Sequence, residues 1–196
     1  MKLPLFPLRT VLFPGGVLPL KVFEQRYIDM TKDCLANERP FGVVLITQGS
    51  EVAQPGEAKV AFESIGTTAR ITNWDMPQLG ILHVATLGGP RFKVERHVIE
   101  GSGLVVGDVR ELPAEPRVPL ATSHSPLANL LELIAARVGP ENFPADADYG
   151  DASWVGYRLA ELLPLPLPIK QSMLEINDAG VRLTVLQKFL SEQGVL

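Results

Sequence analysis

Few residues in this sequence have both the chemistry and the spacing to act as acids, bases or metal ligands. The histidines are His83, His97 and His124, and Cys34 is the only cysteine. None of the histidines has a partner at metal-ligand spacing, and one cysteine is too few for a structural zinc site. His83 and His97 fall within segments that are typical of strands, where a structural role is more frequent than a catalytic one. We therefore expect no metal site and no cofactor.

Motifs for nucleophilic catalysis and nucleotide binding are also absent. The sequence contains no G-x-x-x-x-G-K-[ST] phosphate loop, and Gly101-Ser102-Gly103 lacks the G-x-S-x-G spacing of a nucleophile elbow. Cys34 lies on the apolar face of a predicted helix, which favours a small buried hydrophobe over a nucleophile. We expect that the protein is not an enzyme and has no catalytic residues. The remaining alternative is an enzyme whose site is assembled from residues distant in sequence.

The charged residues are distributed unevenly along the chain. Residues 1–120 contain 13 basic and 13 acidic side chains, whereas residues 121–196 contain 5 basic and 9 acidic ones, for a net charge of −4. Affinity for nucleic acid depends largely on neutralising phosphates with Lys and Arg. The charge balance therefore argues against nucleic acid as a general partner.

The apolar N-terminus does not have the pattern of a secretion signal. Pro4, Pro7 and Pro14 interrupt it, Arg9 adds a charge, and no small-residue cleavage site follows. Nowhere do about 18 apolar residues follow one another without a charge or several prolines, so no membrane span is expected. Because a single cysteine fits a reducing compartment, we expect a cytoplasmic protein.

The elements of the first part of the chain are short and β-like. Residues 41–46 form a continuous apolar run, as expected of a strand buried on both faces, and Gly88-Gly89-Pro90 indicates a hairpin. One helix is expected between Phe23 and Asn37, with Tyr27 and Cys34 on its apolar face. Many short strands at close spacing favour a small barrel or a curled sheet. The strands are expected over residues 3–8, 17–22, 41–46, 60–62, 65–71, 81–87, 92–98 and 104–109.

After Pro119 the apolar residues recur with the period of helices. Ser125, Asp151 and Asp178 are each expected to cap the start of a helix. Gly139-Pro140 is expected to end the first of these helices, because both residues disfavour its continuation.

The change of period divides the chain into two predicted domains. Residues 1–118 form the β-rich domain and residues 119–196 the helical one, with a linker at residues 111–125. The predicted fold class is therefore α+β, a distorted β-barrel with one helix followed by a helical bundle.

Several sequence blocks, in order along the chain, resemble the N-terminal domain of Lon proteases. LPLFPLR at residues 3–9 and VLFPG at residues 11–15 resemble the start of that domain. LPLKVFEQRY at residues 18–27 is the most specific block, because it matches the family pattern L-x-I-F-E-x-R-Y apart from Val22 in place of isoleucine. The later blocks are IGTTARI at residues 65–71, GPRF at residues 89–92 and LAELLP at residues 159–164.

This resemblance implies a PUA-like barrel followed by helices, and a role in recognising unfolded or tagged polypeptides. In full-length Lon, separate downstream domains hydrolyse ATP and cut the substrate, and this chain ends at Leu196, where they would begin. The resemblance thus implies a binding module without catalytic machinery. The alternative is RNA binding through the PUA-like barrel, with Arg91, Lys93 and Arg96 as a basic patch.

Two apolar turns are the candidate polypeptide-binding sites. Leu12, Phe13 and Pro14 precede a pair of glycines, and Trp74 and Met76 flank an aspartate before a proline. Exposed apolar groups on turns can contact extended peptides, and methionine adapts to varied partners. For each turn the alternative is that its side chains tuck under their own loop.

The family-motif residues Glu24, Arg26, Tyr27 and Arg91 are expected to be structural. Glu24 would lie in the first turn of the helix, where a negative charge is favourable, and Tyr27 would pack on the sheet. Arg91 would form an ion pair with a local carboxylate. The sequence does not define the oligomeric state.

Overall fold

The chain folds into two compact units, residues Met1–Pro113 and Ala114–Leu196. The computed structural model describes residues 1–51, 60–139, 143–144 and 146–195. Within the described residues, the first unit contains the strands and one helix, and the second contains the other helices. The predicted α+β class is therefore confirmed.

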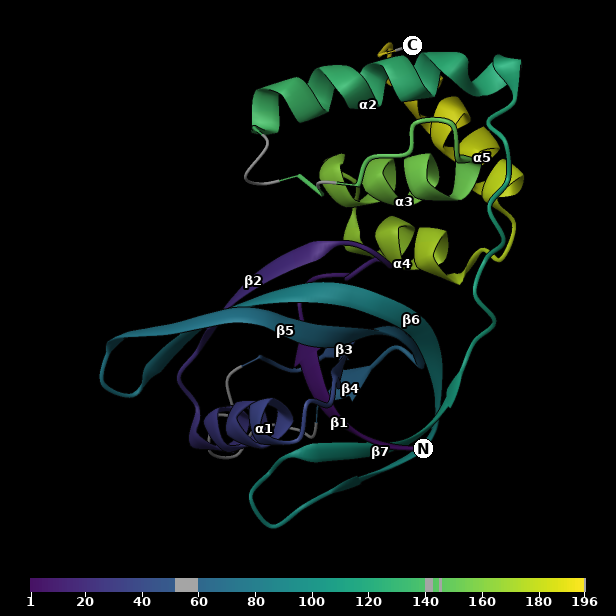
Figure 1. The fold of residues 1–196 in the computed structure, drawn as a ribbon. Helices are drawn as coiled ribbons and strands as arrows, with labels where there is room; N and C mark the ends of the chain where they lie inside the picture. Colours follow the sequence, from purple (N-terminus) through teal and green to yellow (C-terminus); the bar gives the residue numbers. More distant parts are fainter. Residues whose placement is uncertain (52–59, 140–142, 145, 196) are drawn as a thin grey trace. The chain divides into compact units, whose positions relative to one another are not determined.

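The strands of the first unit form a ring (Figure 1). Antiparallel pairs join β1 to β7, β7 to β6, β6 to β5 and β5 to β3, and a parallel pairing of β3 with β1 closes the ring. β2 adds to the first part of β6, and β4 adds to β3. The bounds are β1 Lys2–Leu8, β2 Val17–Val22, β3 Phe41–Gln48, β4 Ala61–Phe62, β5 Ile65–Gln78, β6 Ile81–Ile99 and β7 Val105–Glu111.

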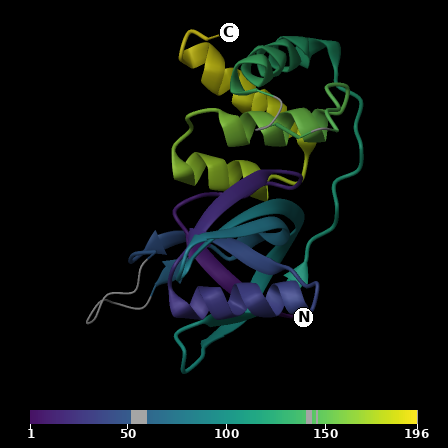
Figure 2. The same cartoon turned by 60° about the vertical axis from the view of Figure 1, so that its left-hand side comes forward.

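One helix, α1 (Gln25–Ala36), packs against the strands of this unit (Figure 2). Tyr27 and Cys34 of α1 are buried, and the Tyr27 ring stacks on Phe6 with the centroids 3.9 Å apart. Val43 and Val44 are successive residues of β3 that belong to different hydrophobic clusters. β3 is therefore buried on both faces, as its continuous apolar run predicts.

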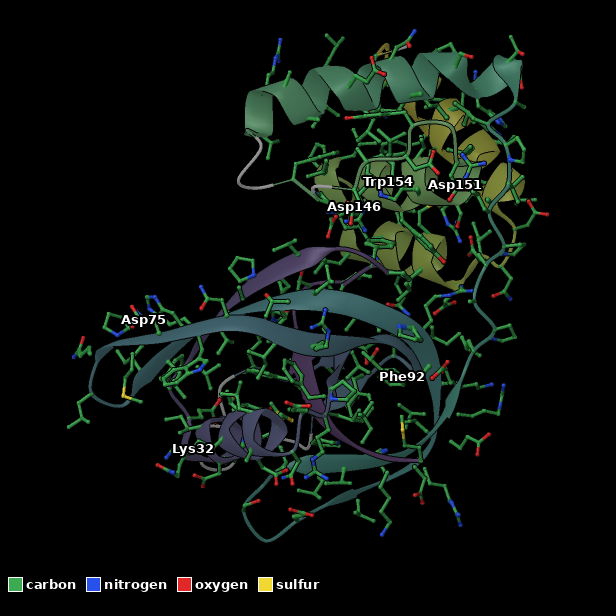
Figure 3. The ribbon with its side chains drawn as sticks, in the orientation of Figure 1. Lys32, Asp75, Phe92, Asp146, Asp151 and Trp154 are labelled. Carbon is green, nitrogen blue, oxygen red and sulfur yellow. The ribbon has the colours of Figure 1, made fainter. Side chains whose placement is uncertain are left out.

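The second unit contains α2 to α5, and two of its predicted caps are confirmed. Asp151 accepts hydrogen bonds from the backbone N–H groups of Ser153 (3.2 Å) and Trp154 (3.3 Å) at the start of α3 (Figure 3). Asp178 accepts one from Val181 (2.8 Å) at the start of α5. No helix in the described part of the chain is both long and apolar enough to cross a membrane. The bounds are α2 Ser125–Val138, α3 Ala152–Leu162, α4 Leu167–Glu175 and α5 Ala179–Glu192.

The third predicted cap, Ser125, is wrong. A short 3₁₀ turn, Thr122–His124, leads into α2, and Ser125 already has helical backbone angles (φ −54°, ψ −36°). An N-cap residue needs an extended backbone for its side chain to reach back to the first free N–H groups. The helix ends as predicted before Gly139, which has φ +88°, whereas Pro140 lies outside the described residues.

Glu115, placed in the predicted linker, has its side chain packed into the helical unit with only 6% of it exposed. Its carboxylate accepts hydrogen bonds from the hydroxyls of Ser153 (2.5 Å) and Tyr157 (2.6 Å) and from the guanidinium of Arg182. Arg182 is fully buried, stacks on the Tyr157 ring at 4.0 Å and also donates to the Met173 carbonyl at 2.9 Å. The linker is thus attached to α3 and α5 by charge-assisted hydrogen bonds, which are stronger than neutral ones.

Candidate functional site

β5 and β6 continue as a hairpin beyond the contact of β5 with β3, and β2 pairs with the other side of β6 there. β3 pairs with β5 only at Thr67–Ala69, whereas the pairing of β5 with β6 continues to Gln78 and Ile81. The turn between them lies away from the other elements of this unit (Figure 1). It contains Gly80 with φ +81°, a left-handed conformation that glycine adopts without strain.

The outer part of this hairpin carries exposed apolar side chains. Trp74 is 53% exposed, Met76 38% and Leu79 93%. Trp74 pairs with Val84 of β6, so both side chains lie on the same face of the hairpin. Val84 belongs to the buried core. Trp74 therefore lies on the same sheet face as a core residue but is exposed to solvent. We call Trp74, Met76 and Leu79 the hairpin patch.

The backbone of the hairpin has a free edge at the same place. The backbone N–H of Trp74 donates to the Asn73 side chain at 2.9 Å, and that of Met76 donates to the Asp75 side chain at 2.8 Å. Since both donors bond to side chains, we infer that they lie on the edge of β5 away from β6. Beyond Ala69, no described strand pairs with this edge. Asp75 is labelled on the outer part of the hairpin in Figure 3.

The sequence predicts a loop at Trp74 and Met76, and the structure places both residues within β5. Pro77 does not prevent this strand, because proline is tolerated on an edge strand where no ladder partner needs its missing N–H. Leu79, the most exposed member of the patch, was missed. Gly80 beside it is the signal that indicates a turn between two strands.

The first predicted apolar turn does not form a surface. Leu12 and Phe13 are buried, with Phe13 fully inaccessible, and Pro14 is half-buried. The Thr67 hydroxyl donates to the Leu12 carbonyl at 2.6 Å. A side chain at Gly88 would lie 2.1 Å from the Phe13 carbonyl, so this close contact requires glycine. The predicted exposure of Leu12 and Phe13 is therefore wrong, because β5 and β6 hold this segment inward.

The family-motif residues at the start of α1 form a packed cluster. Glu24 is the N-cap residue and does not lie in the first turn as predicted; its side chain makes no cap hydrogen bond. It pairs with Arg26 at 3.1 Å, and Arg26 in turn lies 4.5 Å above the Tyr27 ring and donates to the Gly103 carbonyl at 2.9 Å. Burial raises the pKa of Tyr27 to about 12, so its hydroxyl stays protonated. These contacts join α1 to the turn between β6 and β7.

The structure does not assemble the basic patch of the RNA alternative. Arg91 is buried, and Arg96 has Asp108 as an acidic neighbour at 3.8 Å. Glu95 also pairs with Arg110 at 3.2 Å. Lys93 is exposed but stands among these paired charges, so this face has mixed charge.

The described residues contain no cluster that could bind a metal ion, and their cysteine is not a reactive thiol. Among them, no three His, Cys, Asp or Glu side chains converge on one point. Cys34 is buried, and burial raises its pKa to about 11. It borders a hollow of about 450 Å³ as a protonated, poorly nucleophilic thiol. The lining residues are Cys34, Leu35, Glu38, Arg39, Arg70 and Ile71.

Comparison with known families and structures gives consistent matches over nearly the whole chain. A family model described as the ATP-dependent protease La (LON) substrate-binding domain matches residues 2–192. The crystal structure of a Lon N-terminal domain protein from Xanthomonas campestris is 35% identical, with a TM-score of 0.76, over 96% of this chain and 98% of that chain. The N-terminal domain of a Mycobacterium avium complex Lon protease, at 17% identity and a TM-score of 0.64, covers 97% of this chain and 98% of its own, and shares the fold.

The curated relatives are longer proteins. A Lon protease of Anaeromyxobacter dehalogenans is 30% identical over 209 residues, which are 97% of this chain and 23% of the relative. A Lon protease of Phenylobacterium zucineum is 28% identical over 194 residues, which are 95% of this chain and 24% of the relative. The chain thus spans about a quarter of the length of these relatives.

Proposed function

The chain belongs to the family of ATP-dependent protease La (LON) substrate-binding domains, and we propose that it is a non-catalytic module that binds unfolded or partner polypeptide segments. The observation that carries this proposal is the hairpin patch: exposed aromatic and thioether side chains in the outer part of β5 and an exposed leucine in the turn that follows it. Large apolar groups gathered on a surface often mark a protein-binding site.

The patch has the chemistry to bind varied apolar segments. Trp74 offers a rigid aromatic surface, which binding sites favour, and Met76 adapts its shape to different partners. Burying one such side chain against a partner contributes about 1.5–3 kcal/mol. Since native proteins bury most large apolar side chains, an unfolded segment is the partner that presents them.

Substitutions in the patch test the proposal. The probe is fluorescein-labelled lactalbumin, reduced and carboxymethylated so that it stays unfolded, and the measurement is its fluorescence anisotropy. Trp74→Ser and Leu79→Ser should each weaken binding by about tenfold, which corresponds to about 1.4 kcal/mol. Thermal unfolding of each variant serves to exclude a loss of fold.

A matched control lies on β6, outside its pairing with β5. Val98 of β6 is 63% exposed but lies in the part of β6 that pairs with β7. Val98→Ser should leave affinity unchanged. If Val98→Ser weakens binding as much as the patch variants do, or if the patch variants bind normally, the patch is not the binding surface.

Two further parts of the proposal concern chemistry and location. We propose no ATPase or protease activity for this chain, which is supported by the absence of a phosphate-loop motif from its sequence. A cytoplasmic location is proposed from its single cysteine. The RNA alternative has less support, because Arg91 is buried and its neighbouring charges are mixed. Single-stranded RNA added to the anisotropy assay should not displace the unfolded protein.

A further inference from the structure

We propose that the free edge of β5, from Thr72 to Met76, binds an extended polypeptide segment as an added β-strand. The inference rests on the proposed function and defines how the hairpin patch recognises its partner. It assigns to the backbone of β5 a part of the recognition that the apolar side chains alone do not provide.

The first argument is the spacing of the backbone donors. The N–H groups of Trp74 and Met76 are two residues apart, and each donates to a side chain; Trp74 lies opposite Val84 of β6, and Met76 has no partner residue in β6. Donors at every second residue along one edge match the pattern that a neighbouring strand requires. A helix has no equivalent free groups along its side, because its backbone bonds are internal. The edge therefore fits an extended partner.

The second argument is the way these donors are covered. Asn73 and Asp75 accept the two N–H groups through their own side chains, and both residues are exposed. A partner strand can displace such short side chains into water without unfolding any element. In the absence of a partner, the same side chains protect the edge from pairing with other edges, which is a known hazard of free strands.

The third argument is the limited length of the edge. Pro77 has no backbone N–H, and the register of β5 against β6 shifts between Ile71 and Asn73 and again between Asp75 and Gln78. The part of the edge that a partner strand can use is thus short, because it is limited at both of its ends. Main-chain hydrogen bonds contribute affinity without reading sequence, so a short edge suits weak binding to many segments.

The fourth argument joins the edge to the hairpin patch. Trp74 and Met76 supply both the N–H groups covered by side chains and the apolar side chains, and alternate residues of a strand share a face. A partner strand beside β5 would place its own alternate side chains next to these two. The preferred partner is therefore an extended segment with apolar residues at alternate positions, as found in the unfolded state of β-rich proteins.

Backbone-methylated peptides test this mode of binding. The probe is a fluorescein-labelled peptide of ten alternating valine and threonine residues with two lysines at each end. Two derivatives carry N-methyl groups on alternate residues, one on the valines and the other on the threonines, and keep every side chain. Only one alternate set of a strand's N–H groups faces its neighbour. One derivative should bind at least tenfold more weakly than the parent, and the other within about threefold.

The outcomes separate this inference from the proposed function. If the parent peptide binds, Trp74→Ser weakens it, and the two derivatives both keep its affinity or lose it equally, the edge-strand mode is overturned and the apolar patch stands. If unfolded lactalbumin binds but the peptide does not, the same conclusion holds. If neither binds, the proposed function fails and the inference fails with it.

A second copy of the chain is the competing occupant of the edge. Sedimentation velocity should show a monomer whose mass does not change with protein concentration. A dimer that Met76→Pro dissociates and Met76→Ala does not would assign the edge to self-association and overturn the inference. Both variants remove the methionine side chain, but only proline removes the N–H.

Discussion

Removing the Glu115 carboxylate should destabilise the helical unit strongly. Glu115→Ala leaves the guanidinium of Arg182 fully buried, with its bonds to the Met173 and Ile176 carbonyls but without its counter-ion. Breaking a buried ion pair in this way costs about 3–5 kcal/mol. The free energy of unfolding can be measured in urea by the fluorescence of Trp154, in a Trp74→Phe background so that only the helical unit reports.

A matched surface pair gives the scale for this effect. Arg117 and Asp148 form an exposed ion pair at 2.8 Å, and Asp148→Ala should change the free energy of unfolding much less than Glu115→Ala does. Replacing both buried partners, as in Glu115→Leu with Arg182→Met, should recover much of the stability that either single change removes. A loss below about 1 kcal/mol for Glu115→Ala would show that the linker is not held by this carboxylate.

The Glu115 carboxylate also determines whether the stability of the fold rises or falls with pH. Burial alone would raise the pKa of Glu115, but the hydrogen bonds from Arg182, Ser153 and Tyr157 outweigh it and hold the pKa below its ordinary value of 4.5. A carboxyl with a lowered pKa in the folded state stabilises the fold above its unfolded pKa. This contribution should be fully present at neutral pH and disappear as the pH falls below about 4. In Glu115→Gln, the urea midpoint of unfolding should therefore change less with pH in that range than it does in the unsubstituted protein.

Three further predictions follow from burial and capping. Phe13→Ser should lower the free energy of unfolding by about 3–5 kcal/mol, because the ring is fully buried; an unchanged urea midpoint would contradict its place in the core. Asp151→Ala should cost about 1–2 kcal/mol through loss of an N-cap, whereas Ser125→Ala should change stability by less than about 0.5 kcal/mol, and the reverse order would contradict the observed helix starts. Cys34 should react with a thiol reagent far more slowly in the folded protein than in urea, since burial raises its pKa to about 11; equal rates would contradict its burial.

Much of the fold could be predicted because local patterns and tertiary packing agree. The apolar run of β3 predicts a strand buried on both faces, and Val43 and Val44 belong to separate clusters as expected. Asp151 and Asp178 cap helices because their short side chains reach the free N–H groups of the next turn. Ser125 failed because a 3₁₀ turn precedes it, and that turn depends on packing that the local sequence does not reveal.

The candidate site was predictable only in part, because exposure is decided by contacts distant in sequence. Phe13 and Trp74 have the same appearance in the sequence, a bulky ring near a turn. Gly88 and Thr67 hold the Phe13 segment inward through contacts with its backbone, whereas β5 extends past its last contact with β3 and leaves Trp74 exposed. No local sequence pattern indicates that the Phe13 segment is held inward or that β5 extends past β3.

The central claim, that polypeptide binds at the hairpin, is tested most directly by amide hydrogen exchange with and without saturating unfolded lactalbumin. Binding along the free edge of β5 should slow exchange in peptides covering residues 70–84, with the largest effect at the backbone N–H groups of Trp74 and Met76. Exchange in α2 and in the part of β6 that pairs with β7 should not change. Protection confined to the helical unit, or no protection at the hairpin while binding is saturated, would contradict the account.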